Sequence, residues 1–530
     1  MFKFVCPFLL ACLAVGVIRF GIGGGGEPET PSTVVTTELD KVCKTDGLIS
    51  LREAISYANE GDRITFGEPV PGGSVIKLRH GSLKIDKGIV IDGLSSGVKM
   101  SEGITIDGCG RGRVFTVAVP SEGGGAELIG MTVTGGKEKR GGGIFADRCA
   151  LTLTDMTVFG NSAAESGGGI CLDDGVLTAA GSKISENRAD RGGGIYSAGK
   201  SVSVINTKIV GNAAKYGGGG ICAYKGGLTV EDSAIAGNSA YGGEILLEYR
   251  VRATIARSMI FRNTCEAGIN NGELCELTVT DSVISDNQGS GFLNRGTLSV
   301  IGSTISGNSS NQNGGAFRNH GVLTITASTI AENTAIGSGG GVYDTKSLAV
   351  NNTAVYGNSA NVGGGLSEVG GTLSLVNVTV AGNTARSGAG INISGEVEMF
   401  NSIVALNKSK DGGGDFCGPL ADRIVGANNI VGDDPLFTAA PVFELTKRSN
   451  PCRSKFCPAF IEKWELKSPD ALDLSLGAGS AAIDAGSNDA VRTETDLAGN
   501  PRVVNGSVDI GAYEYQGERD TKEADQTAEE

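Results

Sequence analysis

Histidine is almost absent from this sequence, with only His80 and His320 among 530 residues. Two histidines in unrelated contexts exclude a Ser/His/Asp arrangement. No CxxC motif or Cys/His cluster with zinc spacing is present. The glycine runs follow a fixed period and do not open helices, so they form neither a P-loop nor a dinucleotide fingerprint. The sequence therefore offers no triad hydrolase, zinc site or nucleotide site.

Clustered positive charge and helical periodicity are also missing. The formal net charge is −14 and the sequence pI is near 4.9, and no Lys/Arg cluster suited to a phosphate backbone occurs. Nucleic acid is therefore excluded as the expected partner. The 3.6-residue apolar spacing of helical repeats is not found along the repeat region. After the N-terminal leader, no segment is long and apolar enough to span a membrane.

What the sequence has is a repeat of about 25 residues. A short alternating strand is followed by an aliphatic residue, two variable residues, an Asn, several small residues and a glycine run. The Asn recurs at Asn161, Asn187, Asn212, Asn238, Asn263, Asn287, Asn308, Asn333, Asn358, Asn383 and Asn407. A fixed period of this length indicates a solenoid. Strands rich in Thr, Val and Ile predict an all-β fold, namely a right-handed single-stranded parallel β-helix with an N-terminal capping helix.

The repeated positions have physical roles in such a coil. Asn tolerates the left-handed backbone conformation and satisfies polar groups at a tight corner. Stacked Asn side chains in successive coils can hydrogen-bond as a ladder. The glycine runs permit positive φ and close backbone approach at a second corner, and the Ile or Val that follows points into the core. These features predict a scaffold without chemistry.

The N-terminal region divides into three parts. Residues 1–20 have one Lys and then an apolar run with a small-residue exit at Gly16, which predicts a secretory signal peptide. The run before Cys12 is weakly similar to a lipoprotein box, which leaves lipidation of Cys12 open. Residues 21–42 form a linker. Residues 43–130 contain the predicted helix, with a Ser50/Glu53 capping box, which should cover the open end of the rod.

Three segments resemble known families. SLREAI, followed by Ala-Asn and Gly-Asp-x-Ile-x-Phe, resembles the CSLREA domain of secreted bacterial β-helix proteins, with Ile49 in place of the leading Cys. The repeats over 131–415 resemble those of chlamydial polymorphic outer-membrane proteins. SAAIDAG, DLAGNPR and VDIGAYEYQ, within 416–516, resemble the choice-of-anchor Q domain that closes many such proteins. The resemblance implies a secreted or cell-surface rod.

The C-terminal part contains an insert at 438–470 and ends in an acidic tail, 517–530, which we expect to be disordered. Secretion permits disulfides, and three pairs are close enough in sequence or context to be considered. These are Cys265/Cys275, Cys452/Cys457 and Cys43/Cys109. Cys171 and Cys222 lie two coils apart, which is beyond disulfide reach, and should be small core residues.

Two places could carry chemistry. The repeat is broken at 241–276, and there Glu244, Glu248, Arg250 and Arg252 are candidate catalytic residues of a polysaccharide lyase or glycoside hydrolase. Tyr249 is a candidate binding residue in the same stretch, and Asp173 and Asp174 are binding candidates in an earlier turn. An exposed charged strand and a surface turn are the simpler interpretations. Catalysis requires Glu244, Glu248 and Arg250 to face one groove.

These observations lead to a functional expectation. The leading hypothesis is a monomeric, secreted or cell-surface rod with a structural, adhesin-like or glycan-binding role, whose partner is an extracellular polysaccharide or a cell-surface component. The alternative is a lyase or hydrolase of acidic polysaccharide. No cofactor is predicted, with calcium left open, and neither nucleic acid nor a membrane-spanning segment of the mature chain is expected.

Overall fold

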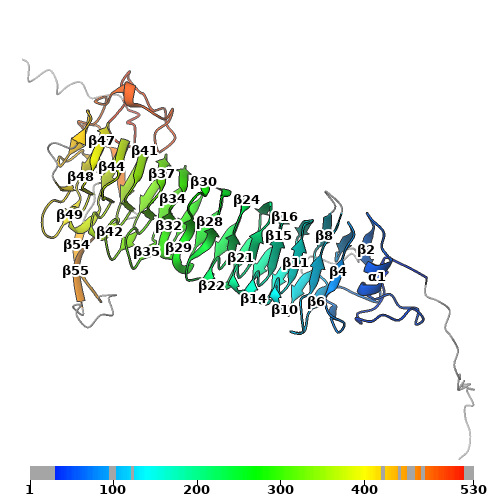
Figure 1. Ribbon diagram of the computed structural model, residues 1–530. Helices are drawn as coiled ribbons and strands as arrows, with labels where there is room; N and C mark the ends of the chain where they lie inside the picture. Colours follow the sequence, from blue (N-terminus) through cyan, green and yellow to red (C-terminus); the bar gives the residue numbers. More distant parts are fainter. Residues whose placement is uncertain are drawn as a thin grey trace, which may run out of the picture.

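The computed structural model describes residues 30–94, 103–120, 125–418, 424–439, 443–449, 460–466 and 472–517. The predicted signal peptide, residues 1–20, and the tail beyond residue 517 lie outside the described residues. Figure 1 shows a rod whose coils stack along one axis, with the N-terminal coils at one end and the C-terminal coils at the other. The chain forms a parallel β-helix, as the sequence predicts.

One coil illustrates the repeat. Strands β12 (Ala150–Thr154) and β13 (Thr157–Phe159) belong to a 29-stranded sheet that receives two strands from most coils, here called the long sheet. Strand β14 (Ser162–Ser166) belongs to a short four-stranded sheet, and β15 (Ile170–Asp173) belongs to a 14-stranded sheet. Each strand pairs in parallel with its counterpart one coil away, so one position of the repeat forms a row along the rod.

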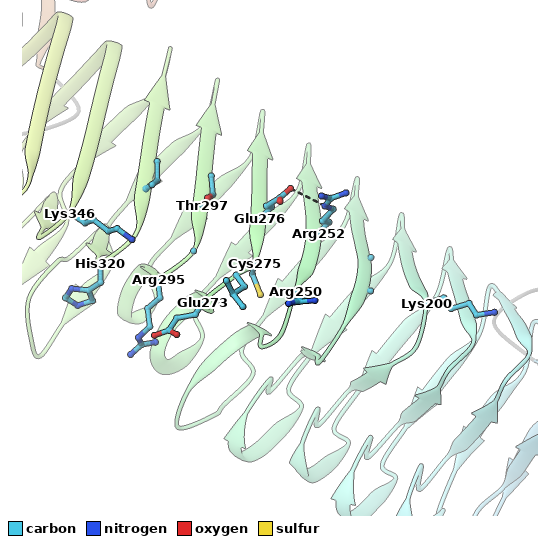
Figure 2. A pocket seen from close by; sticks show the side chains of 15 residues that line it. Lys200, Arg250, Arg252, Glu273, Cys275, Glu276, Arg295, Thr297, His320 and Lys346 are labelled. Atoms are coloured by element: carbon cyan, nitrogen blue, oxygen red, sulfur yellow. Dashed lines mark ion pairs between the residues drawn. The ribbon is translucent and has the colours of Figure 1, made fainter.

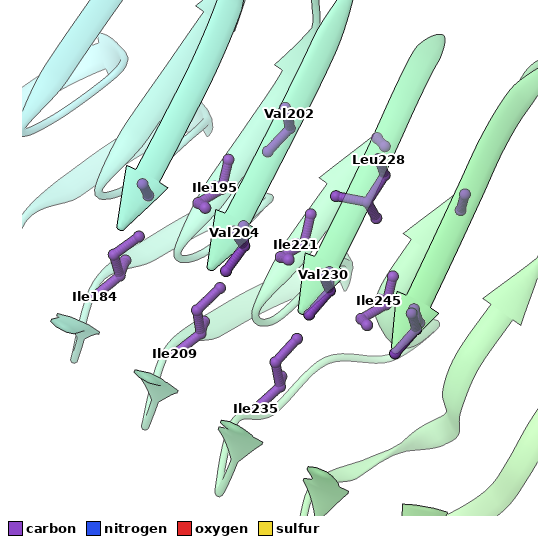
Figure 3. Close-up of a cluster of buried hydrophobic side chains, with 14 of the residues drawn as sticks. Ile184, Ile195, Val202, Val204, Ile209, Ile221, Leu228, Val230, Ile235 and Ile245 are labelled. Atoms are coloured by element: carbon purple, nitrogen blue, oxygen red, sulfur yellow. The ribbon is translucent and has the colours of Figure 1, made fainter. Parts of the chain in front are cut away.

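The core consists of such rows of aliphatic side chains (Figure 3). Ile184, Ile209 and Ile235 occupy one row, and Ile195, Ile221 and Ile245 occupy another; all six are fully buried. Burial of one such side chain contributes roughly 1.5 to 3 kcal/mol. Because the same residue type recurs in each coil, every coil packs on its neighbour in the same way.

The eleven asparagines form a continuous buried ladder. The Asn212 Nδ2 donates to Asn238 Oδ1 at 3.0 Å, and the Asn212 main-chain N–H donates to the same oxygen at 2.9 Å. The ladder ends on a carboxylate, because Asn407 Nδ2 donates to Asp415 Oδ1 at 2.8 Å. The expected left-handed conformation does not fall on the asparagines themselves. It falls on the residue before each one, as at Glu186 (φ 55°), because the Asn side chain must point inward to stack.

The second corner uses the glycine run as predicted. Gly167 has φ 67°, and a Cβ on it would lie 2.6 Å from the Cβ of Cys171. A side chain therefore cannot be placed there. Cys171 is fully buried beneath this corner, on the outer side of β15, since its neighbours Ile170 and Leu172 point into the core. The prediction of a core position for Cys171 and Cys222 is thus correct about burial but wrong about the face.

The predicted helix is α1 (Leu51–Tyr57), and its capping box is present. The Ser50 hydroxyl accepts from the Glu53 N–H at 3.2 Å, and Glu53 Oε2 accepts from the Ser50 N–H at 2.9 Å. Leu51, Ala54 and Ile55 are buried in the same core as the first coils. The helix therefore extends the core at the N-terminal end of the rod (Figure 1).

The C-terminal segment contacts the flank of the last coils rather than their open end. Asn352 Nδ2 donates to the Thr495 carbonyl oxygen at 3.0 Å, and the Ala512 N–H donates to Thr379 Oγ1 at 2.9 Å. Apolar side chains of 474–510 pack on Ile403 and on the outer side of neighbouring strands. Within the insert, β54 (Phe443–Ser449) pairs antiparallel with β55 (Phe460–Leu466), and this hairpin projects from the rod (Figure 1).

The expected disulfides do not form among the described residues. All eight cysteines in that part of the chain are free, including both members of the Cys265/Cys275 and Cys43/Cys109 pairs. The Cys452/Cys457 pair lies outside the described residues. Stability in this rod therefore comes from stacked rows and ladders over the part that the structure describes.

Candidate functional site: a basic groove along the rod

The candidate site lies at the turn that leads from the 14-stranded sheet into the long sheet. This turn recurs in every coil just before the first long-sheet strand. Because these strands stack in register, residues about 25 positions apart meet side by side at the turn. The strands concerned are β20 (Ser201–Ile205), β24 (Gly226–Glu231), β27 (Val251–Ala256), β30 (Glu276–Thr280), β33 (Thr297–Ile301), β37 (Val322–Thr326) and β41 (Ser347–Tyr356).

Along these turns runs a groove of about 1120 Å³. It crosses seven coils, so at the spacing of neighbouring strands it is roughly 29 Å long. Glycines form part of its lining at 226, 227 and 296. Figure 2 shows its polar lining, which projects from six of the seven coils: Lys200, Arg250, Arg252, Glu273, Glu276, Arg295, His320 and Lys346.

The groove is positively charged, although the protein as a whole is acidic. Its lining contains five Lys and Arg side chains and two acidic side chains. Arg252 Nε lies 3.2 Å from Glu276 Oε2, and both side chains are more than half exposed, so that pair contributes little to stability. The other four, Lys200, Arg250, Arg295 and Lys346, form no ion pair among the described residues. Their charge is available to a ligand.

His320 occupies the groove between Arg295 and Lys346 (Figure 2). Its Nδ1 lies 2.9 Å from Thr345 Oγ1, and its ring packs edge-on against Tyr343 at 6.1 Å. Partial burial, and then the charges of Arg318 and Arg295, lower the pKa of His320 below its usual value. The ring is therefore neutral at pH 7 and can both donate and accept hydrogen bonds.

The predicted catalytic residues are not brought together. Glu244 is fully buried, and neither of its carboxylate oxygens has a hydrogen-bond partner among the described residues. Glu248 accepts two hydrogen bonds from Arg191 Nη1, at 2.8 and 2.7 Å. Arg250 and Arg252 line the basic groove instead. Because Glu244, Glu248 and Arg250 occupy three different environments, this stretch supplies no convergent acid/base set.

The predicted binding residues also separate. Asp173 pairs with Arg140 at 3.1 Å, and Asp174 sits in the turn at φ 47° with its carboxylate 3.9 Å from Lys225 Nζ. Both aspartates thus serve local turns and ion pairs. Tyr249, in contrast, immediately precedes Arg250 of the groove, and the Arg250 guanidinium lies 5.3 Å from its ring centroid.

Sequence reasoning missed the groove, although a signal was present. In six of these seven coils, a basic residue or histidine lies one or two positions before the row of long-sheet residues that begins at Ser201. The series is Lys200, Lys225, Arg250, Arg295, His320 and Lys346. Counted along the chain, these residues are dispersed and form no cluster. Aligned by the strand register, they fall into two adjacent rows, with Lys200 and Lys346 in one and the other four residues in the row one position earlier.

The described residues offer no metal site to this groove or elsewhere. In that part of the chain, no group of three or more His, Cys, Asp or Glu side chains is placed to hold a metal ion. The acids of the groove, Glu273 and Glu276, are accompanied by cations. Calcium, left open by the sequence, has no support from this geometry.

The fold places the chain in the class of right-handed parallel β-helix proteins. The family described as "Right handed beta helix region" matches residues 142–309. A solved structure of the pectate lyase Pel9A aligns with 92% of this chain and 98% of its own, at 12% identity and a TM-score of 0.29; so low a score carries no argument about function. No match was found among curated proteins. Within the described part of the chain, no helix has the length and apolarity needed to cross a membrane.

Proposed function

We propose that this protein is a secreted or cell-surface rod that binds an acidic polysaccharide along the basic groove. The observation that carries the proposal is the row of cationic side chains, contributed by every second coil, in one groove of an acidic protein. An extended polyanion would contact these side chains one after another, at intervals of roughly 10 Å, which is twice the coil spacing. Each contact would be weak, and affinity would come from their number.

The acidic surface around the groove supports this function physically. A polyanion is repelled by most of a surface with net charge −14 and is attracted to the positive strip. Complementary charge of this kind orients a ligand and raises its association rate. Because the groove is open to solvent, its ion pairs are screened by salt. Binding should therefore weaken as ionic strength rises.

The enzymatic alternative has less support. The acids and arginine proposed for it do not face one groove, as described above. In the basic groove, Glu273 and Glu276 are the only carboxylates among the described lining residues, and Glu276 is paired with Arg252. A site for glycoside hydrolysis needs two carboxyl groups, one on either side of the scissile bond. In this groove one of the two carboxylates is already paired with an arginine.

The test is a binding and product assay on the mature protein. Polygalacturonate and a neutral glucan would be titrated at low and moderate ionic strength. The variant Arg295→Glu/Lys346→Glu reverses two charges in the groove and should abolish binding of polygalacturonate. The matched control is Lys183→Glu/Lys208→Glu, which makes the same change in net charge at two exposed, directly stacked lysines of another strand row.

Three results are informative. Binding that is lost only in the groove variant supports the proposal. Equal loss of binding in both variants would mean that only the net charge of the protein matters, which contradicts the proposal. New unsaturated ends, absorbing at 235 nm, or new reducing ends would show that the groove cleaves its ligand and would overturn the purely binding role.

A further inference from the structure

Exposed tyrosines are concentrated beside one end of the groove. All ten tyrosines of the chain lie within the described residues, and four of them are exposed: Tyr216, Tyr224, Tyr241 and Tyr249. These four belong to two neighbouring coils, those of β23 (Ile221–Ala223) and β26 (Gly243–Leu247). The part of an aromatic ring that stays in water contributes nothing to folding. Four of them gathered on two coils, next to a binding groove, therefore point to a ligand.

Two of these rings form a stacked pair. The ring centroids of Tyr224 and Tyr249 are 6.2 Å apart with an interplanar angle of 26°. Tyr224 is 43% exposed and Tyr249 is 45% exposed, so each ring keeps nearly half of its surface for a ligand. The Arg250 guanidinium lies 5.3 Å from the Tyr249 centroid. Ring–ring and cation–π contacts hold the pair in place before any ligand arrives.

The pair lies beside the groove, within two residues of its lining. Tyr224 is followed by Lys225 and Gly226, and Tyr249 is followed by Arg250; Gly226 and Arg250 both line the groove. Along the rod these two turns fall between Lys200 and Glu273 (Figure 2). At both turns, the chain thus presents a tyrosine directly before a cation. At the first of these two turns, the residues that line the groove are glycines 226 and 227.

This combination matches a charged sugar. The face of an aromatic ring is electronegative, and the C–H groups on the apolar face of a pyranose carry small positive charges that pack against it. A guanidinium beside the ring matches a carboxylate in bidentate geometry. A nucleic acid would also stack, but its regular line of phosphates would meet Glu273 and Glu276 in the middle of the groove. A uronic acid polymer, with sparser charge, fits the alternation of cations and acids better.

We propose that Tyr224 and Tyr249 form a stacking platform for a sugar ring of the acidic polysaccharide and that Arg250 binds the carboxylate of that sugar. The inference rests on the proposed function and adds the chemical class of the ligand: a polymer of uronic acids, recognised by its ring as well as by its charge.

The experiment separates ring recognition from charge. Wild-type protein and variants would be titrated with polygalacturonate, with poly-L-glutamate as a carboxylate polymer without sugar rings, and with single-stranded DNA. The test variant is Tyr224→Ala/Tyr249→Ala. The matched control is Tyr216→Ala/Tyr241→Ala, which removes the other two exposed tyrosines of the same coils; neither Tyr216 nor Tyr241 adjoins a lining residue of the groove. Tyr224→Phe/Tyr249→Phe keeps the rings.

The expected result is a loss of polygalacturonate affinity of about tenfold or more in the test variant, the size of one stacking contact. Affinity for poly-L-glutamate should not change, and the Phe variant should bind as wild type does. The loss should persist at moderate salt, where the ionic contribution is screened. Unchanged affinity of the test variant for polygalacturonate, with loss in Arg295→Glu/Lys346→Glu, would overturn the platform and leave the proposed function standing.

Three other outcomes would contradict one or both proposals. Equal losses in the test and control variants would mean that these tyrosines act through the general surface, which contradicts the platform. If single-stranded DNA bound more tightly than polygalacturonate and the test variant lost that binding, the platform would stack nucleic-acid bases, and the proposal of a sugar ligand would be wrong. No binding of polygalacturonate by wild-type protein would overturn both proposals. Circular dichroism of each variant, which should match wild type because the rings are exposed, checks the fold.

Discussion

Replacing the buried Glu244 should stabilise the rod and remove part of its pH dependence. The register places Glu244 level with Gly220 in the previous coil and Gly268 in the next. Its carboxyl group is fully buried, and the nearby Gly220 N–H donates to the Glu244 main-chain carbonyl at 3.2 Å rather than to the side chain. Burial without a partner raises the pKa of Glu244 to about 8.

The sign and size of the effect follow from linkage. Below pH 4.5 this carboxyl is neutral in both the folded and unfolded chain, so it adds no pH dependence. Between pH 4.5 and about 8 the unfolded chain releases the proton while the folded chain keeps it, and the free energy of unfolding falls. At 1.36 kcal/mol per pKa unit, the full cost is about 5 kcal/mol, reached above pH 8.

Two substitutions separate the contributions. Glu244→Gln cannot ionise, so its free energy of local opening should lack about 4 kcal/mol of the decrease that wild type shows between pH 5 and pH 8.5. It still buries an unpaired polar group, which costs about 1 to 3 kcal/mol. Glu244→Gly restores the residue type of the neighbouring coils and should remove both costs, less about 1 kcal/mol for glycine in a strand.

Hydrogen exchange is the suitable assay, because coils of a solenoid open locally. Protection of the amides of β23 and β26 would be compared between wild type and each variant at the same pH, so that intrinsic exchange rates cancel. Amides near Ile330, several coils away, are the internal reference. Wild type and Glu244→Gln that respond identically to pH would refute the argument, since Glu244 would then not be a buried neutral acid.

Three further outcomes follow from the scaffold. Asn238→Ala removes the acceptor of two hydrogen bonds from Asn212 and the donor to the Ile209 carbonyl, so it should destabilise its coils by about 2 to 4 kcal/mol, measured by hydrogen exchange against an exposed Ser→Ala control. Asp344 ends a second buried ladder, in which it accepts from Asn319, and burial raises the pKa of Asp344 to about 6. Asp344→Asn should therefore stabilise the rod above pH 6, by up to about 3 kcal/mol. The urea midpoint of the variant should be higher than that of wild type above pH 6 and unchanged below pH 4. Among the described cysteines, exposed Cys109 should react with maleimide in the folded protein, whereas buried Cys171 and Cys222 should react only after unfolding; fast labelling of Cys171 would contradict the closed corner.

The sequence by itself determined the fold, because each structural requirement of a coil falls on a fixed position of the repeat. The spacing of Asn161 to Asn407 sets the coil length, the glycine runs set one corner, and the alternating strands set the core rows. The capping box at Ser50 and Glu53 is equally local, since it involves residues three apart. Local patterns of this kind need no knowledge of distant contacts.

Only the tertiary structure decided which residues meet. Glu244, Glu248 and Arg250 are neighbours in the chain, yet their side chains lie in three different places. Glu244 is within β26 and is buried, Glu248 follows that strand and pairs with Arg191, and Arg250 lies in the next turn and lines the groove. Lys200 and Lys346 are 146 positions apart, yet stacking of the coils places both in one groove. The stacked pair of Tyr224 and Tyr249 arises in the same way. In a β-helix, residues one repeat apart in the sequence lie side by side along the rod. A surface site formed by several coils can therefore be recognised only when the register of the coils is known.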